Sequence, residues 1–134
     1  MSESLAPAVN DLSRPFWNAA AEGRLALPYC VATGCPFWPP APTSPFRTAG
    51  AVEWRDAEAV GIVSSIVVYR RAFQSALAEH LPYGIALVQV ARGVRLLAHL
   101  EDPEAAPKPG TRVNLCFRRL AWSETPVLAI APQE

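Results

Sequence analysis

Two apolar segments in the second half of the chain set the pattern on which the predicted fold depends. Tyr83–Ala91 is almost wholly apolar, and Val94–Leu100 places apolar residues at every second position. A period of two, built from β-branched and large aliphatic residues, is typical of β-strands. Arg92 and Gly93 join the two segments, and glycine supplies the positive φ that a tight hairpin turn requires. The pattern predicts a long β-hairpin, which needs neighbouring strands to be stable.

Three more segments carry a strand pattern. The longest is Ala59–Arg71, where Gly61 and two serines favour a strand that bends sharply. Ala72–Leu81 fits either a helical turn or a loop folded over the barrel, and Thr111–Arg119 and Pro126–Ala131 follow a proline-rich connector. Five antiparallel strands with a long first strand predict a mainly β fold, a small, partly open Greek-key barrel of the OB type.

A short helix is predicted near the start of the chain. Asp11 or Ser13 caps it, Pro15 lies in its first turn, and Gly23 ends it. It is only about two to three turns long, so packing must hold it in place. Its apolar stripe consists of Phe16, Trp17, Ala20 and Ala21.

The segment between this helix and the barrel has little regular structure. Short strands are predicted at Arg24–Tyr29 and Ala51–Ala57, on either side of a loop rich in proline and glycine. We therefore divide the chain into a flexible tail over residues 1–10, the helix and loop segment over 11–50, and the barrel over 51–134.

Composition narrows the class of protein. Hydrophobic residues make up 51% of the 134 residues, which is enough for a single domain with a real core. The formal net charge of zero argues against a protein that binds nucleic acid by neutralising phosphates. No apolar run reaches the ~18–20 residues of a membrane span, and the first residues do not resemble a signal peptide. An odd number of cysteines, three, does not suggest a disulfide framework, so we expect a cytoplasmic protein with reduced thiols.

The cysteines and histidines are the natural candidates for metal binding or catalysis. A zinc ribbon needs four soft ligands, and Cys30 and Cys35 form one slightly wide pair with no second pair after it. Ordinary thiols in a packed loop are the simpler interpretation. Cys116 with His80 or His99 is conceivable as a nucleophile and its base, but nothing local activates the thiol. The sequence therefore predicts no catalytic residue.

Four segments, in order, carry a family resemblance: PFWNAAAEGRLALPYC, FWPPAP, VGIVSSIVVYRR and LPYGIALVQVARGVRLLAHLED. Together they resemble the acyl-CoA-associated OB-fold family, whose members carry an N-terminal rubredoxin-like zinc ribbon followed by an OB barrel. The resemblance covers roughly Arg14 to Pro132, which is nearly the whole chain.

The zinc ribbon departs from the family pattern of two Cys-x2-Cys pairs. Cys30 matches the first ligand, Thr33 stands at the second, and Ser44 and Arg47 fall about where the second pair should be. Cys35 could replace one ligand, but two ligands do not make a closed structural site. We therefore expect a degenerate ribbon with no bound zinc or other cofactor. Prolines and three aromatic residues would then hold the loop, namely Phe37, Trp38 and Phe46.

The resemblance implies an accessory role. Members are similar to small subunits that associate with thiolases, thiolase-like acyltransferases, aldolases or acyl-CoA hydratases, where the large partner carries the catalytic group and a coenzyme A thioester is the substrate of the complex. Because aromatic anchors dominate interface energies, the candidates for partner binding are Phe16, Trp17, Phe37 and Trp38; a role in the domain's own core is the alternative. A second candidate surface, close to the partner's acyl-CoA entrance, consists of Arg70, Arg71 and Phe73.

A single-stranded nucleic-acid-binding OB protein is the alternative function. Such a protein combines a basic groove with aromatic platforms, and arginine pairs occur at residues 70–71 and 118–119. Twelve acidic residues balance the twelve basic ones, so the accessory subunit is the preferred interpretation.

Overall fold

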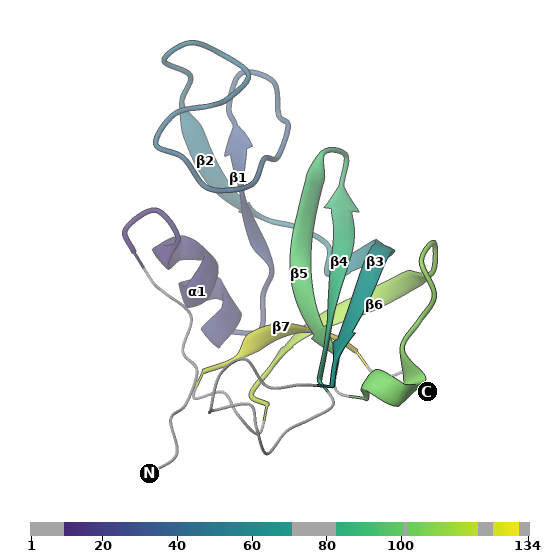
Figure 1. Ribbon diagram of the computed structural model, residues 1–134. Helices are drawn as coiled ribbons and strands as arrows, with labels where there is room; N and C mark the ends of the chain where they lie inside the picture. Colours follow the sequence, from purple (N-terminus) through teal and green to yellow (C-terminus); the bar gives the residue numbers. More distant parts are fainter. Residues whose placement is uncertain (1–9, 71–82, 101, 121–124, 132–134) are drawn as a thin grey trace.

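The fold is that of a computed structural model, which describes residues 10–70, 83–100, 102–120 and 125–131. Within these residues the structure is mainly β, with an α-helix near the start of the described part and a short 3₁₀ turn after the central hairpin (Figure 1). The elements in chain order are α1 (Arg14–Ala21), β1 (Ala26–Cys30), β2 (Val52–Asp56), β3 (Val60–Tyr69), β4 (Tyr83–Ala91), β5 (Val94–Leu100), the 3₁₀ turn η2 (Pro103–Ala105), β6 (Arg112–Arg118) and β7 (Val127–Ile130). Within the described ranges, no helix has the length and apolarity needed to cross a bilayer.

Five strands form a closed barrel in the order β3-β4-β5-β7-β6. Pairing of β3 with β6, from Val60 opposite Asn114 to Ile62 opposite Arg112, closes the ring. All neighbours are antiparallel except β5 and β7, which run parallel with His99 opposite Ala129. The predicted OB barrel is confirmed, and closure leaves few strand edges exposed.

The central hairpin follows the sequence pattern closely. β4 and β5 have the predicted bounds, and Gly93 in the turn has a φ of +75°. On β5 every second side chain from Val94 to Leu100 is buried, whereas Leu97 between them is 62% exposed. The hairpin thus has one face in the core and one outside the barrel.

The main core cluster comprises Phe16, Leu25, Leu27, Val63, Ala86, Val88, Val94, Leu96, Ala98, Leu100, Val113, Leu115, Leu128 and Ile130.

Strand β3 bends where its pairing with β4 shifts register, between Val63 and Ser65. The sequence analysis predicted a sharp bend in this strand, and the register shift interrupts the alternation of buried and exposed side chains there. Val63 is 1% exposed, and Ile66 three positions later also packs against the core. Gly61 permits the close approach, because a Cβ there would lie 2.5 Å from Val88 Cγ1. The inserted residue turns the strand around the barrel.

The segment before the barrel forms a small two-stranded sheet, which we call the ribbon and define as β1, β2 and the loop 31–51. Its strands pair antiparallel, from Ala26 opposite Asp56 to Cys30 opposite Val52. Leu25, just before β1, and Leu27 in β1 belong to the main core cluster. Tyr29, Trp38 and Trp54 of the ribbon pack against that cluster. Figure 1 shows the β1–β2 end projecting from the barrel.

Helix α1 packs beside β1. Ser13 occupies the N-cap position, Pro15 follows in the first turn, and Gly23 after the helix has a φ of +77°. The prediction that Phe16 and Ala20 lie on the buried side of the helix is confirmed. Ala19, not Ala21, is the third buried residue, because the helix turns that side toward the core.

Candidate functional site

An aromatic junction joins the helix, the ribbon and the barrel. The Phe16 ring centroid lies 4.8 Å from that of Trp17, 5.0 Å from Trp38 and 5.6 Å from Phe117. These distances fall within the favourable range for aromatic pairs. Phe16 itself is 5% exposed, so it acts as the buried centre of the junction.

The four aromatic residues predicted to bind a partner divide into two pairs. Phe16 and Phe37 are each 5% exposed and pack within the subunit. Trp17 and Trp38 are only partly buried, and both contact Phe16. The exposed parts of the two tryptophans are therefore the portion of this set that another protein can contact.

The outer face of the hairpin and its neighbour β3 is aliphatic. Ile62, Val67 and Leu97 are 51%, 50% and 62% exposed. Cross-strand pairing places Val67 beside Ile85 and Leu97 beside Leu87, and directly opposed residues share a face. We call these five residues the outer patch. The sequence analysis did not single it out, although the nearly continuous apolar run of β4 was a signal that both faces carry apolar side chains.

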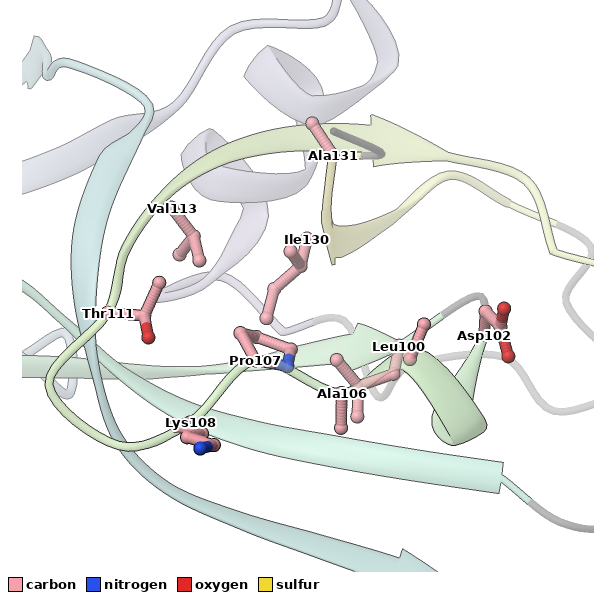
Figure 2. Close-up of a pocket in the computed structure, with 10 residues that line it drawn as sticks. Leu100, Asp102, Ala106, Pro107, Lys108, Thr111, Val113, Ile130 and Ala131 are labelled. Carbon is pink, nitrogen blue, oxygen red and sulfur yellow. The ribbon is translucent and has the colours of Figure 1, made fainter. Parts of the chain in front are cut away.

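A cavity of about 590 Å³ opens where β5, η2, β6 and β7 meet. Its volume lies in the usual range of small-molecule pockets, about 300–1,000 Å³. Figure 2 shows Val113, Ile130 and Pro107 pointing toward its centre, with Asp102 at one edge and Lys108 at another. An apolar group with a polar end would match this lining.

The second predicted surface lies only partly within the described residues. Arg70 is exposed and its Nη1 lies 3.1 Å from Glu104 Oε1 in η2. Exposed pairs of this kind contribute only ~0–1 kcal/mol to stability, so Arg70 can exchange this partner for another. Arg71, Phe73 and the whole Ala72–Leu81 segment lie outside the described residues.

Cys116 and His99, considered from the sequence as a nucleophile and its base, lie at the same level of the barrel. His99 and Cys116 both lie opposite Ala129, one from each side. One strand therefore separates them, and the backbones of β5 and β6 lie two strand spacings, about 10 Å, apart at this point. Burial lowers the pKa of His99 below its usual value. His80 lies outside the described residues.

Three residues at the expected zinc-ligand positions meet in the ribbon. Cys30 is fully buried and Ser44 is 7% exposed. Hydrogen bonds from the Ser44 hydroxyl, then the Thr33 hydroxyl and the Thr33 and Ala32 backbone, lower the pKa of the Cys30 thiol to about 7. We call Cys30, Thr33 and Ser44 the ribbon cluster.

The donor set of the ribbon does not fit zinc. Structural zinc sites use four thiolate or imidazole ligands, whereas the ribbon cluster offers one thiol and two hydroxyls. Arg47, at the fourth position, is exposed and positively charged. Cys35 is exposed, and its Sγ lies 3.7 Å from the Thr33 carbonyl oxygen, to which it donates. Among the residues that the structure describes, no group of three or more His, Cys, Asp or Glu side chains could hold a metal ion.

Comparisons with known proteins give the family. A family model described as "ChsH2, C-terminal OB-fold domain" matches residues 54–118, and one described as "ChsH2, rubredoxin-like zinc ribbon domain" matches residues 17–43. A curated relative, "Probable enoyl-CoA hydratase alpha subunit" of Thermomonospora curvata, is 32% identical over 97 residues. That match covers 70% of this chain but 29% of the relative, so the chain spans less than a third of that protein's length.

A solved structure agrees with the family models. A chain of a protein described as "Ltp2-ChsH2(DUF35) aldolase" matches with a TM-score of 0.78 and 26% sequence identity. The match covers 95% of this chain and 98% of that chain, so ribbon and barrel occur together in both. The chain therefore belongs to the ChsH2 family of proteins, in which a rubredoxin-like zinc-ribbon domain precedes an OB-fold domain.

Proposed function

We propose that this chain is a non-catalytic accessory subunit of an acyl-CoA-processing complex. Its partner would be a larger catalytic subunit of the thiolase-like, acyltransferase, aldolase or hydratase type. The observation that carries the proposal is the end-to-end match, over 95% of this chain, to a chain of the Ltp2-ChsH2(DUF35) aldolase. The relative named as a probable enoyl-CoA hydratase alpha subunit supports the link to acyl-CoA chemistry.

The chemistry of the described residues is consistent with a subunit that does not catalyse on its own. A nucleophile and its general base must come within about 2.6–3.2 Å of each other in a working site. His99 and Cys116 come from β5 and β6, and β7 lies between their backbones at Ala129. The catalytic group of the complex would then belong to the partner.

Two surfaces are available for the partner. The first is the exposed part of Trp17 and Trp38 at the aromatic junction, and the second is the outer patch. Large exposed apolar side chains that are grouped together are typical of interaction sites. The aliphatic character of the outer patch also disfavours the nucleic-acid alternative, because base stacking needs aromatic platforms. Arg70, which pairs with Glu104 in η2, would lie near the acyl-CoA entrance of the complex.

The cofactor and compartment follow from the same residues. We infer that the ribbon binds no zinc, since three of the four ligand positions hold Thr33, Ser44 and Arg47. A cytoplasmic location suits three cysteines that are all free thiols.

The first test of this function is to purify the tagged protein from its own cells and identify what comes with it by mass spectrometry. A stoichiometric thiolase-like, acyltransferase, aldolase or hydratase subunit is expected. Recovery of the protein alone, or with nucleic acid that salt removes, would refute the accessory role.

The second test compares two tryptophans. Trp17→Ala should weaken partner binding at least about tenfold, the effect of losing an interface anchor, while circular dichroism shows a folded subunit. Trp54→Ala is the matched control, because Trp54 is also partly buried against the core but lies on β2. If Trp17→Ala loses its folded signal, Trp17 is a core residue and the junction is not the interface.

A further inference from the structure

Three exposed arginines lie at the end of the barrel next to the hairpin turn. Ile62 of β3 is opposite Gln89 of β4 and Arg112 of β6, and Gln89 is opposite Arg95 of β5. Directly opposed residues share a face of the sheet, so these four residues form a line across the outside of four strands. All four are exposed, and so is Arg92 in the hairpin turn. We call Arg92, Arg95 and Arg112 the basic surface.

A hollow opens between the hairpin turn and β3. The pairing of β3 with β4 ends at Ile62, and from Val60 to Ile62 the strand pairs with β6. The last residues of β4 and the turn therefore extend past β3, and a space of about 330 Å³ remains beside them. Its lining includes Arg92 from the turn and Arg112 from β6, so a single bound group can contact both.

The basic surface has no counter-charge of its own among the described residues. Other arginines of the chain form ion pairs with carboxylates, namely Arg14, Arg24, Arg55 and Arg70. In the described part of the chain, none of the three arginines of the basic surface has such a pair. Neighbouring like charges repel one another, and an anionic group from outside the chain removes this repulsion.

The dimensions of the basic surface favour an acidic protein segment over a small anion. Neighbouring strands lie about 4.8 Å apart, so the backbones at Arg95 and Arg112 are separated by roughly 14 Å along the sheet. An extended segment advances about 3.3 Å per residue, and carboxylates four residues apart in it would span the same length. One phosphate group cannot reach both ends of such a line.

The adjoining surface is aliphatic. Ile62 lies in the line between Arg112 and Gln89 and also belongs to the outer patch, so the two surfaces are continuous. Protein–protein interfaces combine an apolar centre with a polar rim and are enriched in arginine. A nucleic acid would instead need aromatic platforms, and none of the described residues that line the hollow is aromatic.

We propose that the basic surface of Arg92, Arg95 and Arg112 binds an acidic segment of the large catalytic subunit, next to the contact that covers the outer patch. The inference rests on the proposed accessory role and goes beyond it, because it names the chemistry of the partner and the arginines that recognise it. Charge complementarity of this kind fixes the orientation of a partner and speeds its association.

The main test compares two double variants with the same net charge. Arg92→Glu/Arg112→Glu reverses the basic surface, and Arg47→Glu/Arg119→Glu is the matched control, because Arg47 and Arg119 are exposed and form no ion pair with the described residues. Binding is measured by surface plasmon resonance at several salt concentrations, with the purified large subunit that mass spectrometry identifies in the wild-type complex.

Arg92→Glu/Arg112→Glu should weaken binding at least about tenfold and reduce its salt dependence, while circular dichroism shows a folded subunit. The control should bind as the wild-type protein does. Equal loss in the two double variants would overturn the role of the basic surface and leave the accessory role standing. Absence of a large subunit from the wild-type complex would refute the accessory role, and with it the assignment to that subunit.

A second measurement tests the kind of anion with the wild-type protein alone. Fluorescence anisotropy compares a labelled polyglutamate peptide with a labelled oligothymidine of the same length. The peptide should bind more tightly, and inorganic phosphate should release it no better than chloride at the same ionic strength. Tighter binding of the oligonucleotide would indicate a nucleic-acid surface, and selective release by phosphate would indicate a small-anion site. Either result would overturn the proposal.

Discussion

The barrel and the ribbon of this protein are stabilised in different ways. In the barrel, apolar side chains from β3 to β7 meet in one continuous core, which includes Val88 and Leu96 at 0% and 4% exposure. The ribbon contributes fewer residues: Leu27 belongs to that core, and Tyr29, Trp38 and Trp54 pack against it. The far end contains Phe37, packed against Phe46 with ring centroids 6.3 Å apart, and the buried residues Cys30 and Ser44.

The difference predicts that substitutions affect the stability of the two parts differently. A barrel core loses stability when any of its many apolar contacts is removed, and the loss is shared by all strands. A ribbon of two five-residue strands is too small for such a core and depends on a few specific cross-links.

The largest expected effect is in the barrel. Leu96→Ala should lower the free energy of unfolding by about 2–5 kcal/mol, because the cavity left in a closed core cannot collapse fully. Leu97→Ala is the matched control on the same strand, since Leu97 is 62% exposed, and it should change stability by less than about 0.5 kcal/mol. Urea unfolding followed by circular dichroism measures both. Similar losses from the two variants would contradict the assignment of the two hairpin faces.

An intermediate effect is expected in the ribbon. Phe37→Ala should cost about 1–3 kcal/mol locally, less than a full core deletion, because its neighbour Phe46 is half exposed and can move. Hydrogen exchange measures this: the amides of Val31 and Ser44, bonded to carbonyl oxygens within the ribbon, should lose protection. The Leu115 amide, bonded to the Ala59 carbonyl oxygen over 2.7 Å at the barrel, should keep it. Equal loss at all three would show that ribbon and barrel unfold together.

The smallest expected effect is the pH dependence from His99 in the barrel. Burial lowers its folded-state pKa, so below the unfolded pKa of about 6.5 the unfolded chain binds more protons than the folded one. The stability that depends on neutral His99 is therefore fully present above about pH 6.5. It is lost as the pH falls through the folded-state pKa of His99. His99→Gln should reduce the difference in unfolding midpoint between pH 7.5 and pH 5.5. An unchanged difference would mean that His99 does not titrate in this range.

The barrel could be predicted from the sequence in detail, because burial of one strand face produces a period-two pattern that local reading detects. β4 and β5 have the predicted bounds, and the other barrel strands differ at their ends by one or two residues. The β3 bulge could not be placed, since it depends on how Gly61 and Val63 meet β4. The division of the chain at residue 51 stays a prediction; β2 pairs with β1, and the barrel strands begin at Val60.

The candidate site was less predictable. Aromatic residue type suggested all four of Phe16, Trp17, Phe37 and Trp38 as anchors, but residue type does not say which rings the fold encloses. The structure buries Phe16 and Phe37 and leaves part of each tryptophan accessible. The outer patch was missed because its members come from three strands, and only their pairing brings them side by side.

Sequence by itself determined the strand pattern of the barrel, the family and the loss of three zinc-ligand residues, because each is recorded in the type and spacing of residues along the chain. Tertiary structure decided which residues meet. The parallel contact of β5 with β7 and the aromatic junction around Phe16 both join positions distant in sequence. Such contacts depend on how whole helices, strands and loops pack against one another. The local periodicity of the sequence does not encode that packing.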